Sequence, residues 1–248
     1  PGLNAYGVMV QDQPALCFDR VRYEGDPVAA VAAVDAATAA RALALIEVEY
    51  EPLPVVDDVR SAMLPDSPQV HEGGNVLDDD RYVRGDVESA WASCAHIVED
   101  TYTTPRQMHA FMETEGGFAR PTADGGLEIF VGAQANTRDR MQLARILALP
   151  EEKIRVVSSP TGGAFGGKDE LTIQPPLALL ALKAGVPVRL HLNREESTIA
   201  GWKRTPLTIR VRSGCDTEGR LLAQEVDLLC ETGAYSSWSI AVSTARWP

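Results

Sequence analysis

The spacing of hydrophobic and polar positions predicts two helices and a strand in the middle of the chain. Over 137–147 apolar residues recur on one helical face before Pro150, which ends the pattern. A continuous apolar run predicts a buried helix over 175–184, whose two leading prolines suit the first turn because their missing N–H groups cost little there. Between these helices, 154–157 reads as a strand. The residues assigned to the apolar face of the first helix are Met141, Ala144, Leu147 and Ala148.

The two ends of the chain show shorter patterns. Near the start, strand-like residues over 28–34 and 46–50 flank an alanine-rich helix over 36–45, an order typical of a small α+β domain. Near the end, alternating residues over 208–212 and 223–229 surround an Asp-Thr-Glu-Gly turn and predict a hairpin.

These elements predict an α+β fold in two domains. Residues 1–60 form the first, and 61–81, rich in Pro, Asp, Ser and Gly, form a linker. Residues 82–248 form the second domain, in which strands alternate with the two long helices. No internal repeat is visible.

Charge and cysteine usage narrow the class of protein. Lys and Arg number 23 against 35 Asp and Glu, and the net charge of −12 argues against nucleic acid or an anionic membrane as a partner. No run of 18 or more apolar residues predicts a membrane span. The four cysteines form no Cys-x-x-Cys pair, which excludes an iron–sulfur or zinc site built from this chain alone. These features favour a cytoplasmic enzyme.

A glycine-rich loop at 162–170, Gly-Gly-Ala-Phe-Gly-Gly-Lys-Asp-Glu, is the strongest chemical signal. Glycine has no Cβ, so such a loop can bring backbone N–H groups and one aromatic ring close to a ligand. It matches the Gly-x-x-x-x-Gly-Lys half of a nucleotide-phosphate loop. However, Asp169 stands where that loop needs Ser or Thr to bind Mg²⁺, which argues against an NTPase. A purely structural turn is the alternative to a ligand loop.

The loop resembles that of the molybdenum hydroxylases, the xanthine dehydrogenase and aldehyde oxidase family. Gln134 lies 31 residues before Phe165, the spacing at which that family places a glutamine near molybdenum. Further motifs follow in the family's order, among them His-Ala-Phe-Met-Glu-Thr-Glu-Gly-Gly from His109 and Glu-Thr-Gly-Ala-Tyr from Glu231. The resemblance covers nearly the whole chain. It implies that residues 1–60 are part of a hammerhead-like domain and that 82–248 begin the molybdopterin-binding domain.

The resemblance also implies a cofactor and a set of site residues. The cofactor is molybdopterin or its cytosine dinucleotide form, with iron–sulfur clusters and FAD on partner subunits or domains. Gln134 and the Phe165 region would lie near molybdenum without binding it directly. Asp169 and Arg204 would contact substrate, although the purine-oxidising members have Glu at the first of these positions. That both are ordinary surface charges is an equal alternative. The cofactor-binding residues implied are Gln134, Gly163, Ala164, Phe165 and Gly166.

The activity implied is hydroxylation of a purine-like or nicotinate-like heterocycle, or oxidation of an aldehyde, with water as the oxygen source. The assembled enzyme would be a dimer. The family's general-base glutamate is expected beyond Pro248, so the 248 residues, read as an internal piece of a longer subunit, would be inactive alone. Glu113 and Glu115 are interpreted as pocket or structural carboxylates rather than the base. The alternative is a catalytically inactive fragment that acts only as a scaffold.

Overall fold

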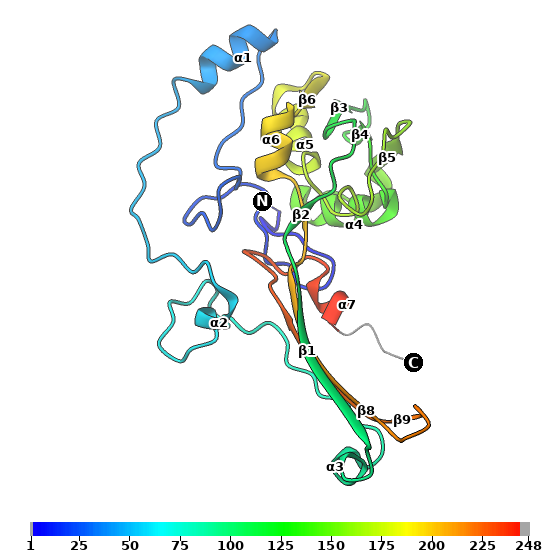
Figure 1. The fold of residues 1–248 in the computed structure, drawn as a ribbon. Helices are drawn as coiled ribbons and strands as arrows, with labels where there is room; N and C mark the ends of the chain where they lie inside the picture. Colours follow the sequence, from blue (N-terminus) through cyan, green and yellow to red (C-terminus); the bar gives the residue numbers. More distant parts are fainter. Residues whose placement is uncertain (1, 244–248) are drawn as a thin grey trace. The chain divides into compact units, whose positions relative to one another are not determined.

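The computed structural model describes residues 2–243 (Figure 1). Pro1 and residues 244–248, with Pro248 among them, lie outside the described residues. The chain divides into two compact units. The first comprises Pro1–Pro54, Met108–Lys203 and Ala234–Ser237, and the second comprises Val55–Gln107, Arg204–Gly233 and Trp238–Pro248. Both helices and strands build the chain, which is α+β as the sequence predicts.

A four-stranded sheet organises the first unit. Its order is β5 (Ile154–Ser158), β4 (Leu127–Val131), β3 (Gly116–Pro121) and β6 (Val188–His191). The β3–β4 and β3–β6 pairs are antiparallel, whereas β4 and β5 run parallel. A parallel pair needs a crossover connection, and a helix supplies it here. The carboxyl ends of β4 and β5 therefore lie at the same edge of the sheet.

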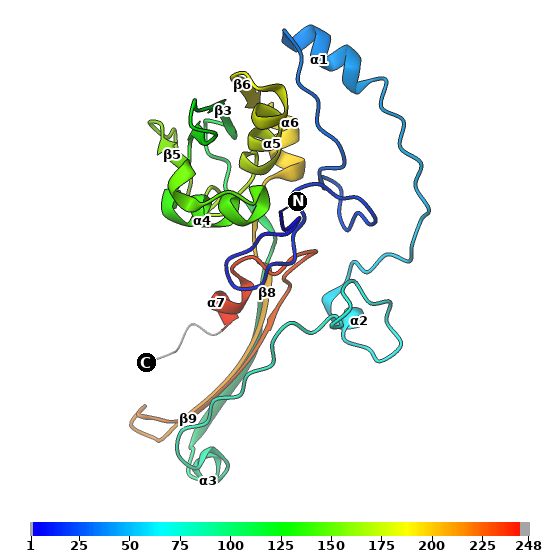
Figure 2. The same cartoon turned by 180° about the vertical axis from the view of Figure 1, so that it is seen from behind.

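Two helices pack on this sheet (Figure 1 and Figure 2). The crossover helix α4 (Asn136–Leu147) contacts β5, and α5 (Gln174–Ala184) contacts β3, β4 and β6. Both helices and the strand over 154–157 confirm the sequence prediction. Each helix stops at a residue with left-handed backbone, as is common at C-caps. The core between the helices and the sheet includes Leu127, Ile129, Val131, Leu143, Leu177 and Ala181, all nearly inaccessible.

The buried face of α4 differs from the predicted one. Leu143 and Ile146 are buried together with Ala144, while Met141 is 38% exposed. The strand β5 and the helix α5, which contact α4, determine which of its faces is covered. Short elements complete this part of the unit: η1 (Glu151–Lys153) and α6 (Arg194–Ala200), which starts with a capping box between Asn193 and Glu196.

The first 54 residues contain fewer elements than predicted. Helix α1 (Ala36–Leu43) forms where a helix was expected, capped by the Asp35 side chain, which accepts a hydrogen bond from the backbone N–H of Thr38. The predicted strands over 28–34 and 46–50 are wrong, since neither segment forms a strand in the structure. A strand needs a neighbour to satisfy its N–H and C=O groups, and within residues 2–243 neither segment has one.

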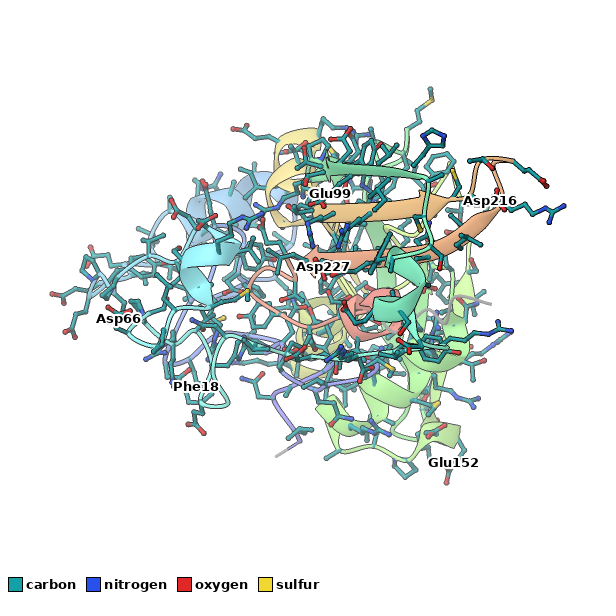
Figure 3. All side chains as sticks on the ribbon, turned by 60° about the horizontal axis from the view of Figure 1, so that its bottom comes forward. Phe18, Asp66, Glu99, Glu152, Asp216 and Asp227 are labelled. Atoms are coloured by element: carbon teal, nitrogen blue, oxygen red, sulfur yellow. The ribbon has the colours of Figure 1, made fainter. Side chains whose placement is uncertain are left out.

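An antiparallel sheet forms most of the second unit, in the order β1 (His96–Thr104), β8 (Leu207–Cys215) and β9 (Leu221–Cys230). Strands β8 and β9 form the predicted hairpin, and its turn is held by the Asp216 carboxylate, which accepts from two backbone N–H groups at 2.9 Å. Glu99 and Asp227 project from the outer strands (Figure 3). Arg210 on the central strand donates to both at 2.7 Å and so ties the three strands together.

Few other elements occur between residues 2 and 243. They are α2 (Val59–Ala62), α3 (Val87–Trp91), α7 (Ser239–Ser243) and a two-stranded ladder of β2 (Gln107–Met108) with β7 (Lys203–Arg204). Residues 63–86, all of which the structure describes, form no helix or strand. Between residues 2 and 243, every helix is too short or too polar to cross a membrane.

Candidate functional site

The glycine-rich loop and Gln134 meet at one edge of the four-stranded sheet. Gln134 follows the carboxyl end of β4, and the loop follows the carboxyl end of β5 before α5 begins. Because β4 and β5 are parallel neighbours, their carboxyl ends deliver both segments to the same place. Open α/β sheets bind ligands at such edges.

Hydrogen bonds fix the orientation of the Gln134 side chain. Its Oε1 accepts from the backbone N–H of Gly166 at 3.1 Å and of Lys168 at 3.2 Å. The backbone N–H of Gln134 in turn donates to Lys168 O at 3.0 Å. With the oxygen held by two donors, the Nε2 group is left as the outward-facing donor, and it has no acceptor among residues 2–243. The side chain therefore presents N–H groups, and no acceptor, to a ligand.

The loop backbone is folded in the left-handed region at three positions. Gly163, Phe165 and Gly166 have φ values of 106°, 53° and 91°. A phenylalanine with positive φ is strained by about 1–3 kcal/mol, and this one also leaves 74% of its surface exposed. Within the described chain, the backbone N–H groups of residues 163–165 have no acceptor. Successive free N–H groups in such a conformation are typical of an anion-binding or oxygen-binding nest.

An open depression of about 390 Å³ adjoins Gln134 and the first turn of α4. No side chain caps the start of this 12-residue helix, whose N-cap position is Ala135. The N-terminus of α4, which is the positive end of the helix dipole, therefore borders this site. A positive helix end also favours a ligand with acceptor oxygens. The lining residues are Ala133, Gln134, Ala135, Asn136, Thr137, Arg138 and Ser158.

Two residues predicted to contact substrate have protein partners. The carboxylate of Asp169 forms an ion pair with Arg138, a residue of α4 that sequence reasoning missed. Arg204 belongs to the second unit, where its Nη2 donates to Pro105 O at 2.7 Å. No sequence signal linked Arg138 to Asp169, because the pair joins positions 31 residues apart.

Two buried acids, Asp139 on α4 and Glu170 at the end of the loop, were not among the predicted site residues. Asp139 on α4 is fully buried, and burial raises its pKa to about 7 despite a hydrogen bond from Gln174 Nε2 at 3.1 Å. Glu170, 2% exposed, has two carboxylate oxygens with no partner among residues 2–243. Burial raises the pKa of Glu170 to about 7 as well; the nearby Arg138 lowers it, and Asp169 and Asp139 add to the rise. Both acids therefore hold a proton in part of the population near neutral pH.

Glu113 and Glu115, interpreted from the sequence as pocket or structural carboxylates, lie in different surroundings. Glu115 is 2% exposed, and its two oxygens have no hydrogen-bond partner within the described residues. Glu113 is bound to the loop through Gly162 and Lys168, a contact that no sequence pattern indicated. Among the described residues no group of three or more His, Cys, Asp or Glu side chains is arranged to hold a metal ion. Donor groups, rather than metal ligands, characterise this site.

Family models match both parts of the chain. The molybdopterin cofactor-binding domain matches residues 70–246, and the hammerhead domain of aldehyde oxidase and xanthine dehydrogenase matches residues 1–54. The donor-lined loop fits this assignment, because a cofactor rich in acceptor atoms requires hydrogen-bond donors and close backbone approach.

Individual proteins agree with these matches. The chain is 52% identical over 242 residues to a probable xanthine dehydrogenase subunit of Bacillus subtilis, covering 98% of this chain and 32% of the relative. It is 39% identical over 244 residues to the nicotinate dehydrogenase large molybdopterin subunit of Eubacterium barkeri, covering 98% of this chain and 57% of that relative. The chain thus spans about a third to somewhat more than half of these relatives.

Solved structures share the fold. The aldehyde oxidoreductase of Desulfovibrio gigas superposes with a TM-score of 0.86 at 30% identity, over 89% of this chain and 24% of that one. The quinoline 2-oxidoreductase of Pseudomonas putida gives 0.85 at 30% identity, over 93% and 30%. With the family model matching most of the chain and the donor-lined loop at the expected place, the chain belongs to the molybdenum hydroxylases, the xanthine dehydrogenase and aldehyde oxidase family.

Proposed function

We propose that this chain forms part of the molybdopterin site of an enzyme that hydroxylates a nitrogen heterocycle of the purine or nicotinate kind. The observation that carries the proposal is the fixed Gln134 amide, which presents only its donor, beside three unpaired loop N–H groups. The choice of substrate class is supported by the relatives named xanthine dehydrogenase and nicotinate dehydrogenase. Aldehyde oxidation is the second candidate, supported by the likeness to an aldehyde oxidoreductase.

In this proposal each residue of the loop has a physical task. Gln134 Nε2 donates to an oxygen of the cofactor, and the N–H groups of Gly163, Ala164 and Phe165 donate to further acceptor atoms, with Gly166 keeping the backbone close. The exposed Phe165 ring excludes water from the ligand side of the loop. The bound molybdenum cofactor supplies oxidation of a substrate carbon with oxygen from water. The hydrogen-bond donors of this chain orient the cofactor and stabilise its charge.

Asp169 and Arg204 are proposed to contact the substrate, each through its own chemistry. The Asp169 carboxylate, oriented by Arg138, would accept a hydrogen bond from a ring N–H. The Arg204 guanidinium would hold a carbonyl or carboxylate oxygen of the substrate. Asp169→Asn is expected to lower kcat/KM for heterocycles by roughly 10- to 100-fold while sparing aldehydes. Equal loss for both substrate classes would argue against this role.

The whole protein is proposed to be a cytoplasmic enzyme with iron–sulfur and FAD subunits or domains that accept its electrons, assembled as a dimer. Its domains are proposed to be hammerhead-like over 1–60, a connection over 61–81 and cofactor-binding from 82 to 248. Family matches over 1–54 and 70–246 support this division. The competing proposal is a scaffold without activity.

Molybdenum content is the first test. The natively purified protein, with whatever copurifies, should contain close to one molybdenum per copy of this chain, together with iron, by plasma mass spectrometry. A mature protein without molybdenum would refute the proposed function and favour the scaffold.

The Gln134→Glu variant then tests the donor. Glutamate keeps an oxygen for the Gly166 and Lys168 N–H groups but replaces the donor with an acceptor. We expect turnover to fall about 100- to 1,000-fold, as for other preorganised donors, with molybdenum retained. Gln69→Glu, a change at an exposed residue, is the matched control. Wild-type turnover in Gln134→Glu would contradict the assignment.

A further inference from the structure

Glu113 joins the two ends of the glycine-rich loop. Its Oε2 accepts from the backbone N–H of Gly162 at 2.6 Å, and its Oε1 accepts from Lys168 Nζ at 3.1 Å. Gly162 and Lys168 are the first and seventh residues of the loop, and Glu113 itself precedes β3. One carboxylate from a separate segment therefore spans nearly the whole loop, and the unpaired N–H groups of 163–165 lie between its two contacts.

Lys168 makes this contact strong. The side chain is 2% exposed, and its ammonium group lies 4.6 Å from the centre of the buried Phe111 ring. An ammonium group buried among apolar atoms is unstable without a counter-charge. The only carboxylate paired with it in residues 2–243 is that of Glu113. The Lys168 charge thus holds the loop to Glu113, while its backbone N–H holds the loop to Gln134.

Two glycines leave room for this carboxylate. A Cβ at Gly132 would lie 2.7 Å from Glu113 Oε1 and 3.4 Å from Lys168 Nζ. A Cβ at Gly162 would lie 2.9 Å from the Cβ of Glu113. Neither glycine has a positive φ, so space for Glu113, rather than backbone conformation, accounts for their small size. The fold of this region is built around the carboxylate.

The charge state of Glu113 is consistent with a permanent ion pair. Burial by itself would raise its pKa, but hydrogen bonds from the Gly162 N–H and from Lys168 outweigh burial and lower the pKa below its ordinary value. The carboxylate is therefore ionised at neutral pH.

We propose that Glu113 is a positioning residue, which clamps both ends of the loop so that the 163–165 N–H groups are held ready for the cofactor. This inference rests on the proposed function of the loop. Glu113 contacts only protein groups in the structure, so it acts through Gly162 and Lys168.

Hydrogen exchange at loop amides that Glu113 does not touch is the decisive readout. The N–H groups of Gly166 and Lys168 are bound to Gln134, so they report on the conformation of the loop as a whole. We would measure them in the complete protein purified from cells that make no molybdopterin. In Glu113→Gln, these amides should exchange roughly 10- to 100-fold faster than in wild type, because charge-assisted bonds that hold the loop closed are lost. Glu152→Gln, at an exposed glutamate on η1, is the matched control and should leave exchange unchanged.

A double variant separates positioning from mere stability. Glu113→Met leaves the buried Lys168 charge unpaired and should lower Tm, whereas Glu113→Met with Lys168→Met removes both charges and should restore much of it. Loop amides should still exchange fast in the double variant, and its molybdenum content under cofactor-producing conditions should fall at least tenfold. If the double variant recovers slow exchange and molybdenum together with Tm, Glu113 is only structural and the proposal is overturned.

The hydrogen-exchange experiment tests the clamp, and the molybdenum measurement tests the proposed function, so either proposal can be refuted without the other. Unchanged Gly166 and Lys168 exchange in Glu113→Gln, relative to the Glu152→Gln control, overturns the clamp whatever the cofactor. Fast exchange in a protein whose wild type never contains molybdenum supports the clamp of the loop and refutes the proposed function instead.

Discussion

The buried acid Asp139 should make the protein lose stability as pH rises from about 4 to about 7. Its side chain is fully buried, its Oδ2 accepts from Gln174 Nε2 at 3.1 Å, and its Oδ1 has no partner among residues 2–243. Burial raises its pKa from 3.8 to about 7. Between these values the folded protein keeps a proton that the unfolded chain has released. Folding is therefore favoured at the acid end, and the advantage is lost as pH rises.

The size of the effect follows from the shift. Roughly three pH units at about 1.4 kcal/mol each give a penalty of about 4 kcal/mol, developed between about pH 4 and pH 7 and complete above pH 8. Asp139→Asn cannot ionise, so this share of the pH dependence should vanish. The amide leaves its NH₂ group without an evident acceptor, which costs about 1–3 kcal/mol at every pH. The variant should thus be less stable than wild type near pH 4, where Asp139 carries almost no penalty, and at least as stable at pH 8.5.

Urea unfolding followed by tryptophan fluorescence at about pH 4 to 8.5 measures this crossover. Glu170, whose pKa burial also raises to about 7, leaves a residual slope, which Asp139→Asn with Glu170→Gln should flatten further. Asp66→Asn, at the exposed Asp66 labelled in Figure 3, is the control and should run parallel to wild type. Parallel pH profiles for Asp139→Asn and wild type would refute the reasoning, since they would show that Asp139 does not change its proton occupancy on unfolding.

Three further substitutions test the packing and capping of the first unit. Gly167→Ala would place a Cβ 2.7 Å from Cε1 of the buried Phe111 ring and should lower the free energy of unfolding by about 1–3 kcal/mol. In the control Gly73→Ala the new Cβ has nothing within 4 Å, so the free energy of unfolding should not change. Equal shifts of the urea midpoint in the two variants would exclude the clash. Leu177→Ala empties a fully buried position between α5 and the sheet and should cost about 2–5 kcal/mol by urea unfolding; a loss below about 1 kcal/mol would mean that the site is not packed as described. Asn193→Ala removes the side-chain cap of α6 and should cost about 1 kcal/mol, with faster hydrogen exchange in that helix; unchanged exchange would argue that the cap does not hold it.

The elements that the sequence predicted correctly are those whose signals lie within a few neighbouring residues. The helices over 137–147 and 175–184 and the hairpin near Asp216 follow from periodicity, proline positions and turn residues, all within a few residues of one another. The strands over 28–34 and 46–50 were predicted wrongly, because a strand is defined by its neighbour and no local pattern supplies one. The prediction of the buried face of α4 was wrong for a related reason, because its partners β5 and α5 determine which side is covered.

The sequence by itself predicted a glycine-rich ligand loop, since glycine content is a property of the chain, and the resemblance to the family added Gln134 through its 31-residue spacing from Phe165. Only the tertiary structure decided how that site is held. Glu113 meets Gly162 and Lys168 across 49 and 55 residues, and Arg138 meets Asp169 across 31. The parallel β4–α4–β5 crossover carries Arg138 and the loop to one sheet edge. Strand β3, antiparallel to β4, begins at that same edge and so brings Glu113 there. Burial there also raises the pKa of Asp139 and Glu170, a change that depends on surrounding atoms and leaves no trace in residue order.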